Sequence, residues 1–262
     1  MTRALLVGDN VGLPLLLRTV PRAAVTAVMA ASLRPHYLDD LGQLARQTGV
    51  LFLVQPRVDS TEYPRFLKEF RGARFDLLIC CSYSMLIQPA MLKAVEYNAV
   101  NVHASLLPRN RGPNPIQWAI IKDELTTGLT LHYMDDGIDT GDIIAQADEP
   151  IHDADTWVSL TERVSGRTAP LLAAHLPAIL DGAAPRRSQS AAEATHNPRL
   201  TPESPRIDLA TMSDREVFNL IRAQVRPLHG AFLEASDRQR RHFPEYLSMD
   251  GVARLRAAMC AA

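Results

Sequence analysis

The sequence has little cysteine, almost no net charge and no long apolar run, and each shortage excludes a class of protein. Three of its 262 residues are cysteine (Cys80, Cys81 and Cys260), too few and too unevenly spaced for a disulfide framework, so we expect buried thiols in a reducing compartment. No C-x-x-C or His-x-x-x-His spacing indicates a zinc site. The net charge of −1 provides no general attraction to nucleic acid or to an anionic membrane.

The apolar stretches are short throughout. The N-terminal one is too short for a signal peptide, and none is long enough to span a membrane, so we expect a cytoplasmic protein without membrane contact. Hydrophobic residues nevertheless make up 47% of the sequence, which is ample for a packed core. The length fits one large domain, or one domain with a small appendage.

Short apolar runs alternate with helical patterns along most of the chain. Strands are predicted at residues 4–7, 25–29, 50–54, 75–81, 99–103, 128–134 and 143–148. Helices are predicted at residues 12–20, 37–48, 62–70, 89–95, 116–122 and 157–180, and Pro170 and Pro177 are expected to break or kink the last one. The alternation predicts an α/β fold with a doubly wound, mostly parallel, Rossmann-like sheet, whose catalytic groups lie at the carboxyl ends of strands.

The composition changes after residue 181. Residues 182–205 contain four prolines among small and polar residues, which predicts a surface linker between a main domain, residues 1–181, and a small C-terminal α/β appendage, residues 206–262. Within the appendage a helix is predicted at 214–226, with Ser213 as its N-cap. Its apolar residues need a covering surface, either on the main domain or on a second subunit, and we expect a homodimer.

Three polar side chains are spaced for acyl-transfer chemistry. Asn101 and His103 are one residue apart on a predicted strand, so both side chains point to one face of it. Asp139 follows on a loop bracketed by Gly137 and Gly141. Taken singly, each of the three also fits a structural role, in the core, at a strand end or in a turn. Together, an amide donor, an imidazole base and a carboxylate suit the attack of an amine on a carbonyl carbon.

The residues around this trio resemble the formyltransferases that use 10-formyltetrahydrofolate. The family pattern is Asn-x-His-x-Ser-Leu-Leu-Pro-x-x-Arg-Gly followed by a loop ending Asp-x-Gly, and it stands here at Asn101–Gly112 and Asp139–Gly141. The resemblance covers roughly residues 4–180 and is strongest to the branch with methionyl-tRNA formyltransferases and sugar N-formyltransferases. It implies the formyltransferase fold, a catalytic domain at residues 1–181, and an enzyme that takes 10-formyltetrahydrofolate as co-substrate and needs no metal.

The same resemblance implies a role for each member of the trio. Asn101 would donate a hydrogen bond to the oxygen of the tetrahedral intermediate. His103 would collect the proton of the attacking amine and help to stabilise the oxyanion. Asp139 would orient His103 together with an ordered water that relays protons.

Two loops are implied as the walls of the folate pocket, and four further residues are assigned to the acceptor. The predicted folate residues are Ser84, Met85, Leu86, Ile87, Met134, Asp135, Asp136, Gly137 and Ile138. From the residues alone, the first loop is also an ordinary strand–helix loop, and the carboxylates of the second lack the spacing of an EF-hand, so no metal is predicted. The predicted acceptor residues are Gly8, Asn10, Ser105 and Arg111. The loop at Gly8 lacks a full G-x-G-x-x-G, and a tight turn is its alternative interpretation.

The acceptor itself is left open. The stretch at residues 112–120 resembles sugar N-formyltransferases and favours a nucleotide-linked amino sugar. An amino acid, hydroxyornithine or a peptide-antibiotic precursor is the next choice. A tRNA acceptor is disfavoured by the net charge and by the short stretch after the linker. A formyltetrahydrofolate hydrolase and a non-catalytic folate-binding protein are the other classes. The expected partners are therefore a small-molecule amine and a second copy of the chain, with no nucleic acid and no membrane.

Overall fold

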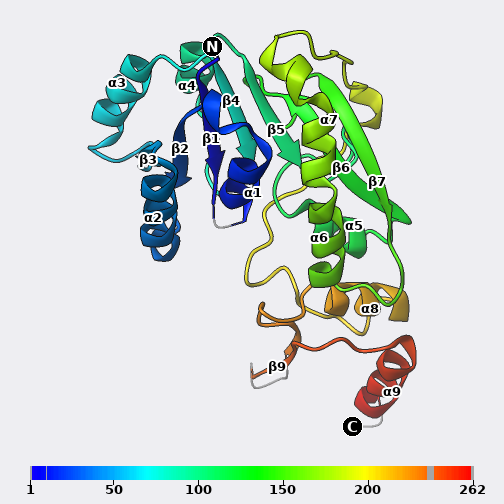
Figure 1. The fold of residues 1–262 in the computed structure, drawn as a ribbon. Helices are drawn as coiled ribbons and strands as arrows, with labels where there is room; N and C mark the ends of the chain where they lie inside the picture. Colours follow the sequence, from blue (N-terminus) through cyan, green and yellow to red (C-terminus); the bar gives the residue numbers. More distant parts are fainter. Residues whose placement is uncertain (1, 10, 235–238, 261–262) are drawn as a thin grey trace. The chain divides into compact units, whose positions relative to one another are not determined.

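The computed structural model describes residues 2–9, 11–234 and 239–260 (Figure 1). The chain divides into two compact units. The first unit comprises Met1–His103, Leu129–Ala147 and Arg167–Ala192, and the second comprises Ala104–Gly128, Asp148–Gly166 and Glu193–Ala262. Each unit therefore combines segments that are far apart in the sequence. The expected main domain, linker and appendage stay a prediction.

A mostly parallel sheet forms the centre of the first unit. In the described residues its seven strands run in the order β3-β2-β1-β4-β5-β6-β7. The strands are β1 (Ala4–Gly8), β2 (Val25–Ala31), β3 (Leu51–Gln55), β4 (Leu77–Cys81), β5 (Ala99–His103), β6 (Thr126–Tyr133) and β7 (Ile143–Pro150). The pairs from β3 across to β5 are parallel, whereas β6 is antiparallel to β5. The predicted Rossmann-like fold is confirmed.

Apolar side chains on both faces explain why this sheet forms. The helices of the unit are α1 (Gly12–Thr19), α2 (Leu38–Thr48), α3 (Tyr63–Ala73), α4 (Pro89–Ala94) and α7 (Thr168–Leu180). Every residue of β1 and β4 is buried, as expected for strands covered on both sides. On one face, alternate residues such as Leu5, Leu78 and Ala99 pack with apolar side chains of α3 and α4. Helices α1 and α7 contact each other and lie on the opposite side of the sheet (Figure 1).

The strand order reverses between β1 and β4, which are neighbours in the sheet. In open α/β sheets, ligands bind at the carboxyl ends of the strands at such a point. Here the loops after the two strands meet, because the Asp9 backbone N–H donates to Ser82 O at 3.0 Å. The approach is close enough to require glycine, since a Cβ at Gly12 would lie 1.8 Å from Cys81 O.

The long helix predicted over residues 157–180 is two helices. Helix α6 (Trp157–Gly166) ends at a glycine, and α7 begins at Thr168. The expected break is therefore present at Arg167, because Pro170 has no N–H to bond the carbonyl of Gly166 and cannot continue α6. Pro170 lies in the first turn of α7, where the backbone N–H has no helical partner to lose, and Pro177 is accommodated inside the helix.

The second unit has its own apolar core. Its other elements are α5 (Pro115–Ile121), α8 (Asp214–Arg222), β8 (Ala231–Glu234), β9 (Arg240–Phe243) and α9 (Met249–Cys260). Buried side chains of α8, β8 and α9 form one cluster, which includes Val217, Phe218 and Val252. Helix α8 begins with the predicted cap, because the Ser213 hydroxyl accepts from the Glu216 N–H at 3.3 Å and the Glu216 carboxylate accepts from the Ser213 N–H.

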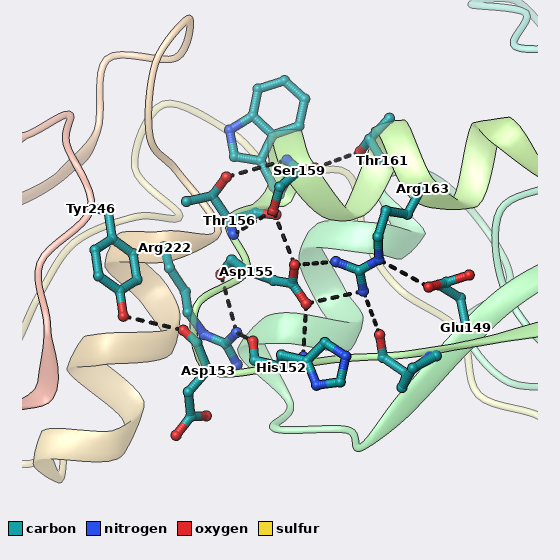
Figure 2. Close-up of polar contacts among 12 residues, drawn as sticks. Glu149, His152, Asp153, Asp155, Thr156, Ser159, Thr161, Arg163, Arg222 and Tyr246 are labelled. Atoms are coloured by element: carbon teal, nitrogen blue, oxygen red, sulfur yellow. Dashed lines mark hydrogen bonds and ion pairs between the residues drawn. The ribbon is translucent and has the colours of Figure 1, made fainter.

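Two arginines of the second unit fix the segment that runs from the end of β7 to the start of α6, as Figure 2 shows. Arg163 on α6 donates to Glu149 Oε1 at 2.9 Å and to the carboxylate of Asp155. Arg222 on α8 is 1% exposed and donates to the carbonyl oxygens of His152 at 2.8 Å and Asp155 at 3.2 Å. Burying a guanidinium costs free energy unless it is hydrogen-bonded. The backbone carbonyls of His152 and Asp155 must therefore stay beside Arg222, which fixes the path of this loop.

Candidate active site

The predicted imidazole and carboxylate lie next to each other in the first unit. His103 is the last residue of β5 and is buried. Its Nδ1 lies 3.5 Å from Asp139 Oδ2. Asp139 reaches this position from the loop after β6 with a left-handed backbone, φ +53°. The carboxyl end of β5 and the returning loop thus bring together two residues that are far apart in the sequence.

Asn101 faces a second histidine that the sequence did not assign to the site. The register of β5 and β6 pairs Asn101 with His132, and Asn101 Nδ2 lies 3.2 Å from His132 Nε2. His132 Nδ1 lies 2.7 Å from Tyr133 O. A carbonyl oxygen only accepts, so Nδ1 carries the ring proton and Nε2 accepts from the Asn101 amide. The orientation of the Asn101 amide is therefore set by His132.

His132 is held in its neutral form. The ring is 2% exposed, and this burial lowers its pKa to about 4, although the nearby Asp139 carboxylate acts in the opposite direction. Its Nε2 lies 3.7 Å from Asp139 Oδ1. The signal in the sequence was a polar residue within an apolar strand, but only the antiparallel register reveals its partner.

The loop after β4 is fastened by two buried polar side chains, one directly after β1 and one at the end of β3. The Asp9 carboxylate accepts the Ser84 N–H at 2.9 Å. Gln55 is 1% exposed, donates to Leu86 O at 3.1 Å, and accepts from the Tyr83 hydroxyl at 2.9 Å. A loop fixed through its backbone presents the same backbone groups to a ligand whatever side chains it carries.

The loop after β6 is ordered by its own carboxylates. Asp135 Oδ1 accepts from Gly137 N at 3.1 Å and from Thr140 Oγ1 at 2.5 Å, and Asp136 accepts from the Tyr97 hydroxyl at 3.0 Å. Asp135 therefore acts within the loop, and Asp136 ties the loop to Tyr97, which lies just before β5.

One apolar side chain from each of the two predicted folate loops contacts the same hydrophobic cluster. Ile87 belongs to the apolar cluster beneath α3 and α4, and Met134 packs against the same cluster. Leu86 and Ile138 are 61% and 50% exposed, which is unusual for side chains of this size.

The four predicted acceptor residues are not brought together in one unit. Gly8 ends β1, where a Cβ would meet Cys81 O at 2.7 Å, so close backbone packing already explains this glycine. Asn10 lies outside the described residues. Ser105 and Arg111 are buried in the second unit, where the Ser105 hydroxyl donates to Arg109 O at 2.7 Å. Their role at the acceptor stays a prediction.

In the described part of the chain, no group of three or more His, Cys, Asp or Glu side chains is placed to hold a metal ion. Within the same residues, no helix combines the length and the apolar character needed to cross a membrane. Both cysteines whose side chains are described, Cys80 and Cys81, are buried free thiols, and burial raises the pKa of each.

A buried imidazole, a carboxylate and an oriented amide thus lie together around β5 of a doubly wound sheet. Residues 24–175 match the model of the formyl transferase family, and the chain belongs to that family.

Individual relatives agree with this family. A methionyl-tRNA formyltransferase of Caldanaerobacter subterraneus subsp. tengcongensis is 34% identical over 190 residues, which are 72% of this chain and 60% of that protein. The chain spans between 46% and 60% of the length of the curated relatives it matches.

Solved structures share the fold. A sugar N-formyltransferase from a Shewanella species superimposes with a TM-score of 0.75 at 22% identity, over 95% of this chain and 98% of that one. An N-formyltransferase from Helicobacter canadensis, in complex with folinic acid and dTDP-3-aminofucose, superimposes with a TM-score of 0.61 at 20% identity, over 85% of this chain and 80% of that one.

Proposed function

We propose that this protein transfers a formyl group from 10-formyltetrahydrofolate to a primary amine. The observation that carries the proposal is the cluster of Asn101, His103 and Asp139 at the carboxyl end of β5. It combines a donor for an oxyanion, a proton acceptor and an orienting carboxylate. These are the groups that acyl transfer to an amine requires.

Each residue of the cluster has a distinct task in the proposed reaction. A C–N bond forms between the amine and the formyl carbon, and the bond from that carbon to N10 of the folate breaks. Asn101 uses its second amide hydrogen on the developing oxyanion, since the first is donated to His132; such a donor contributes about 3–4 kcal/mol to the transition state. His103 takes the proton of the amine. Asp139 faces Nδ1 of His103, so we assign the proton exchange to Nε2. The proton is finally delivered to N10, which leaves as a neutral amine.

The folate is proposed to bind between residues 84–87 and 134–138. The exposed Leu86 and Ile138 supply apolar contacts for a ring, and Asp9 and Gln55 hold the first loop in one backbone conformation. Formyl carbon and amine would then meet beside Asn101, and holding both in one site contributes at most roughly 7–11 kcal/mol through proximity.

We propose a nucleotide-linked amino sugar as the acceptor. The residues at 112–120 resemble those of sugar N-formyltransferases. The solved structure of one sugar N-formyltransferase superimposes on 95% of this chain. A second solved relative holds a dTDP-linked amino sugar together with folinic acid. A tRNA acceptor is the second candidate, because a methionyl-tRNA formyltransferase is 34% identical over 190 residues.

An acceptor screen tests this function. The purified protein is mixed with 10-formyltetrahydrofolate and one of four additions: dTDP-linked amino sugars, ornithine derivatives, methionyl-tRNA, or no amine. Folate absorbance reports turnover and mass spectrometry identifies the formylated product, with His103→Ala as the control. We expect an amino sugar to gain one formyl group. Rapid formate release without an amine would instead identify a hydrolase, and a formylated tRNA would overturn the proposed acceptor.

The expected homodimer stays a prediction of the sequence. Light scattering on the full chain measures it, and a monomer at micromolar concentration would contradict it.

A further inference from the structure

We propose that Gln189 is a positioning residue that holds Asp139 in its reactive place. The residue lies in the stretch that composition assigned to a linker, and within the first compact unit. The inference rests on the proposed function, because it concerns the carboxylate of the same reaction. Gln189 does not touch the reacting atoms; it acts through the backbone of the loop that carries Asp139.

The contact joins one side-chain amide to two backbone carbonyls. Gln189 Nε2 lies 2.9 Å from Asp139 O and 2.7 Å from Gly141 O. Both partners only accept, so the nitrogen of the carboxamide must face them, and its two hydrogens suffice for one bond each. Two carbonyl oxygens turned toward the same point repel each other unless a donor lies between them. Gln189 supplies that donor.

The loop needs such support because its conformation is unusual. Asp139 has φ +53°, a left-handed backbone that side-chain-bearing residues rarely adopt. Gly141 packs so tightly that a Cβ there would lie 2.0 Å from Tyr133 O. The base of the loop is closed by Tyr133 N donating to Asp142 O at 2.8 Å. Gln189 fastens the stretch just before this closing bond, from Asp139 to Gly141.

The residues before Gln189 give it a firm support. Arg187 exchanges two backbone hydrogen bonds with Ile143 at 2.8 and 3.0 Å, which attaches this segment to the start of β7. The Ser188 hydroxyl donates to Asp142 Oδ1 at 3.1 Å. The guanidinium of Arg186 stacks on the Tyr133 ring at 3.5 Å. The segment is therefore bound to the same strands that carry the catalytic loop.

A small movement of this loop would change the chemistry. The Asp139 carboxylate lies 3.5 Å from His103 Nδ1 and 3.7 Å from His132 Nε2, so a rotation of its backbone alters both contacts. Misplacement of a catalytic group by about 1 Å can cost about a hundredfold in rate. We therefore expect Gln189→Met, which keeps the length of the side chain and removes the donor, to lower kcat by about tenfold to a hundredfold.

Hydrogen exchange tests the fastening without any acceptor. Mass spectrometry follows the peptide that covers residues 134–143 in the wild type, Gln189→Met and the control Gln47→Met, which makes the same change at an exposed position of α2. We expect exchange in this peptide to accelerate by at least about fivefold, the equivalent of one lost hydrogen bond, in Gln189→Met alone. Equal exchange in all three proteins would overturn the proposal.

A double-mutant cycle separates positioning from general stability. Turnover of the acceptor found in the screen is measured for Gln189→Met, Asp139→Asn and the double variant. If Gln189 acts through Asp139, the Gln189→Met substitution should lower turnover only slightly when Asp139 is already Asn. A reduction in turnover by the same factor in both backgrounds would refute the proposal. If the loop loosens in Gln189→Met but the wild type formylates no amine, the proposed function is refuted and the fastening of the loop by Gln189 remains supported.

Discussion

Acidification is expected to destabilise this protein through His132. Burial lowers the pKa of this imidazole to about 4, against an ordinary value of 6.5 in the unfolded chain. Between these two values the unfolded state binds more protons than the folded state, so the free energy of unfolding falls as the pH falls from about 6.5 to 4. The two pKa values differ by about 2.5 units, and each unit corresponds to about 1.4 kcal/mol, so the free energy of unfolding should fall by about 3 kcal/mol. Above pH 6.5 the ring is neutral in both states and contributes no pH dependence.

The measurement compares the wild type with His132→Gln. Glutamine does not titrate, and its Oε1 can accept from the Asn101 amide in place of Nε2. Urea unfolding at constant ionic strength is followed by fluorescence and circular dichroism at pH 7, 6, 5 and 4, and coincident transitions justify a two-state free energy. All other titrating groups are shared, so the difference between the proteins reports His132 together with its electrostatic coupling to Asp139 and His103. His36→Gln makes the same change at an exposed residue. An equal loss of stability in wild type and His132→Gln between pH 7 and 4 would refute the reasoning.

Three further results are expected. His103→Ala and Asp139→Asn should each lower turnover at least about a hundredfold while near-UV circular dichroism stays unchanged, because proton transfer contributes about 10²–10⁴-fold; near-normal turnover in a folded variant would contradict their assignment. Gln55→Leu should weaken the binding of folinic acid about five- to tenfold in a calorimetric titration, because it frees the loop at Leu86, whereas Gln43→Leu at an exposed site should bind normally. Arg222→Met should lower the free energy of unfolding by about 3 kcal/mol, since it leaves buried carbonyls unpaired; an effect no larger than that of Arg226→Met, whose side chain is 72% exposed, would contradict this.

Much of the fold could be predicted because its signals are local. A continuous apolar run such as Leu77–Cys81 has few alternatives to a buried strand, and the alternation of such runs with helical patterns specifies the doubly wound sheet. Asn101 and His103 could be placed on one face because their spacing equals the period of a strand. The N-cap of α8 was equally readable, since Ser213 and Glu216 form a capping box within four residues.

The remaining features depend on contacts that leave no local signal. The partnership of Asn101 with His132 follows from the antiparallel register of β5 and β6, whereas the apolar pattern of β6 fits either direction. Gln189 lies among prolines and small residues, and its two acceptors are 48 and 50 residues away in the sequence. Composition indicated a linker there, while the backbone bonds of Arg187 to β7 give the segment a defined place.

The two histidines near Asp139 have different tasks, and the hydrogen bonds decide which is which. Both ring nitrogens of His132 are engaged, Nδ1 with Tyr133 O and Nε2 with the Asn101 amide, so this ring exchanges no proton with the reactants without first breaking a buried contact. Its low pKa preserves the unprotonated Nε2 on which the orientation of Asn101 depends. In the proposed reaction, proton exchange is thereby left to His103, which shares the carboxylate of Asp139 from the other side. Under the proposed mechanism, a single buried neutral ring thus both orients the oxyanion donor and leaves the role of base to its neighbour.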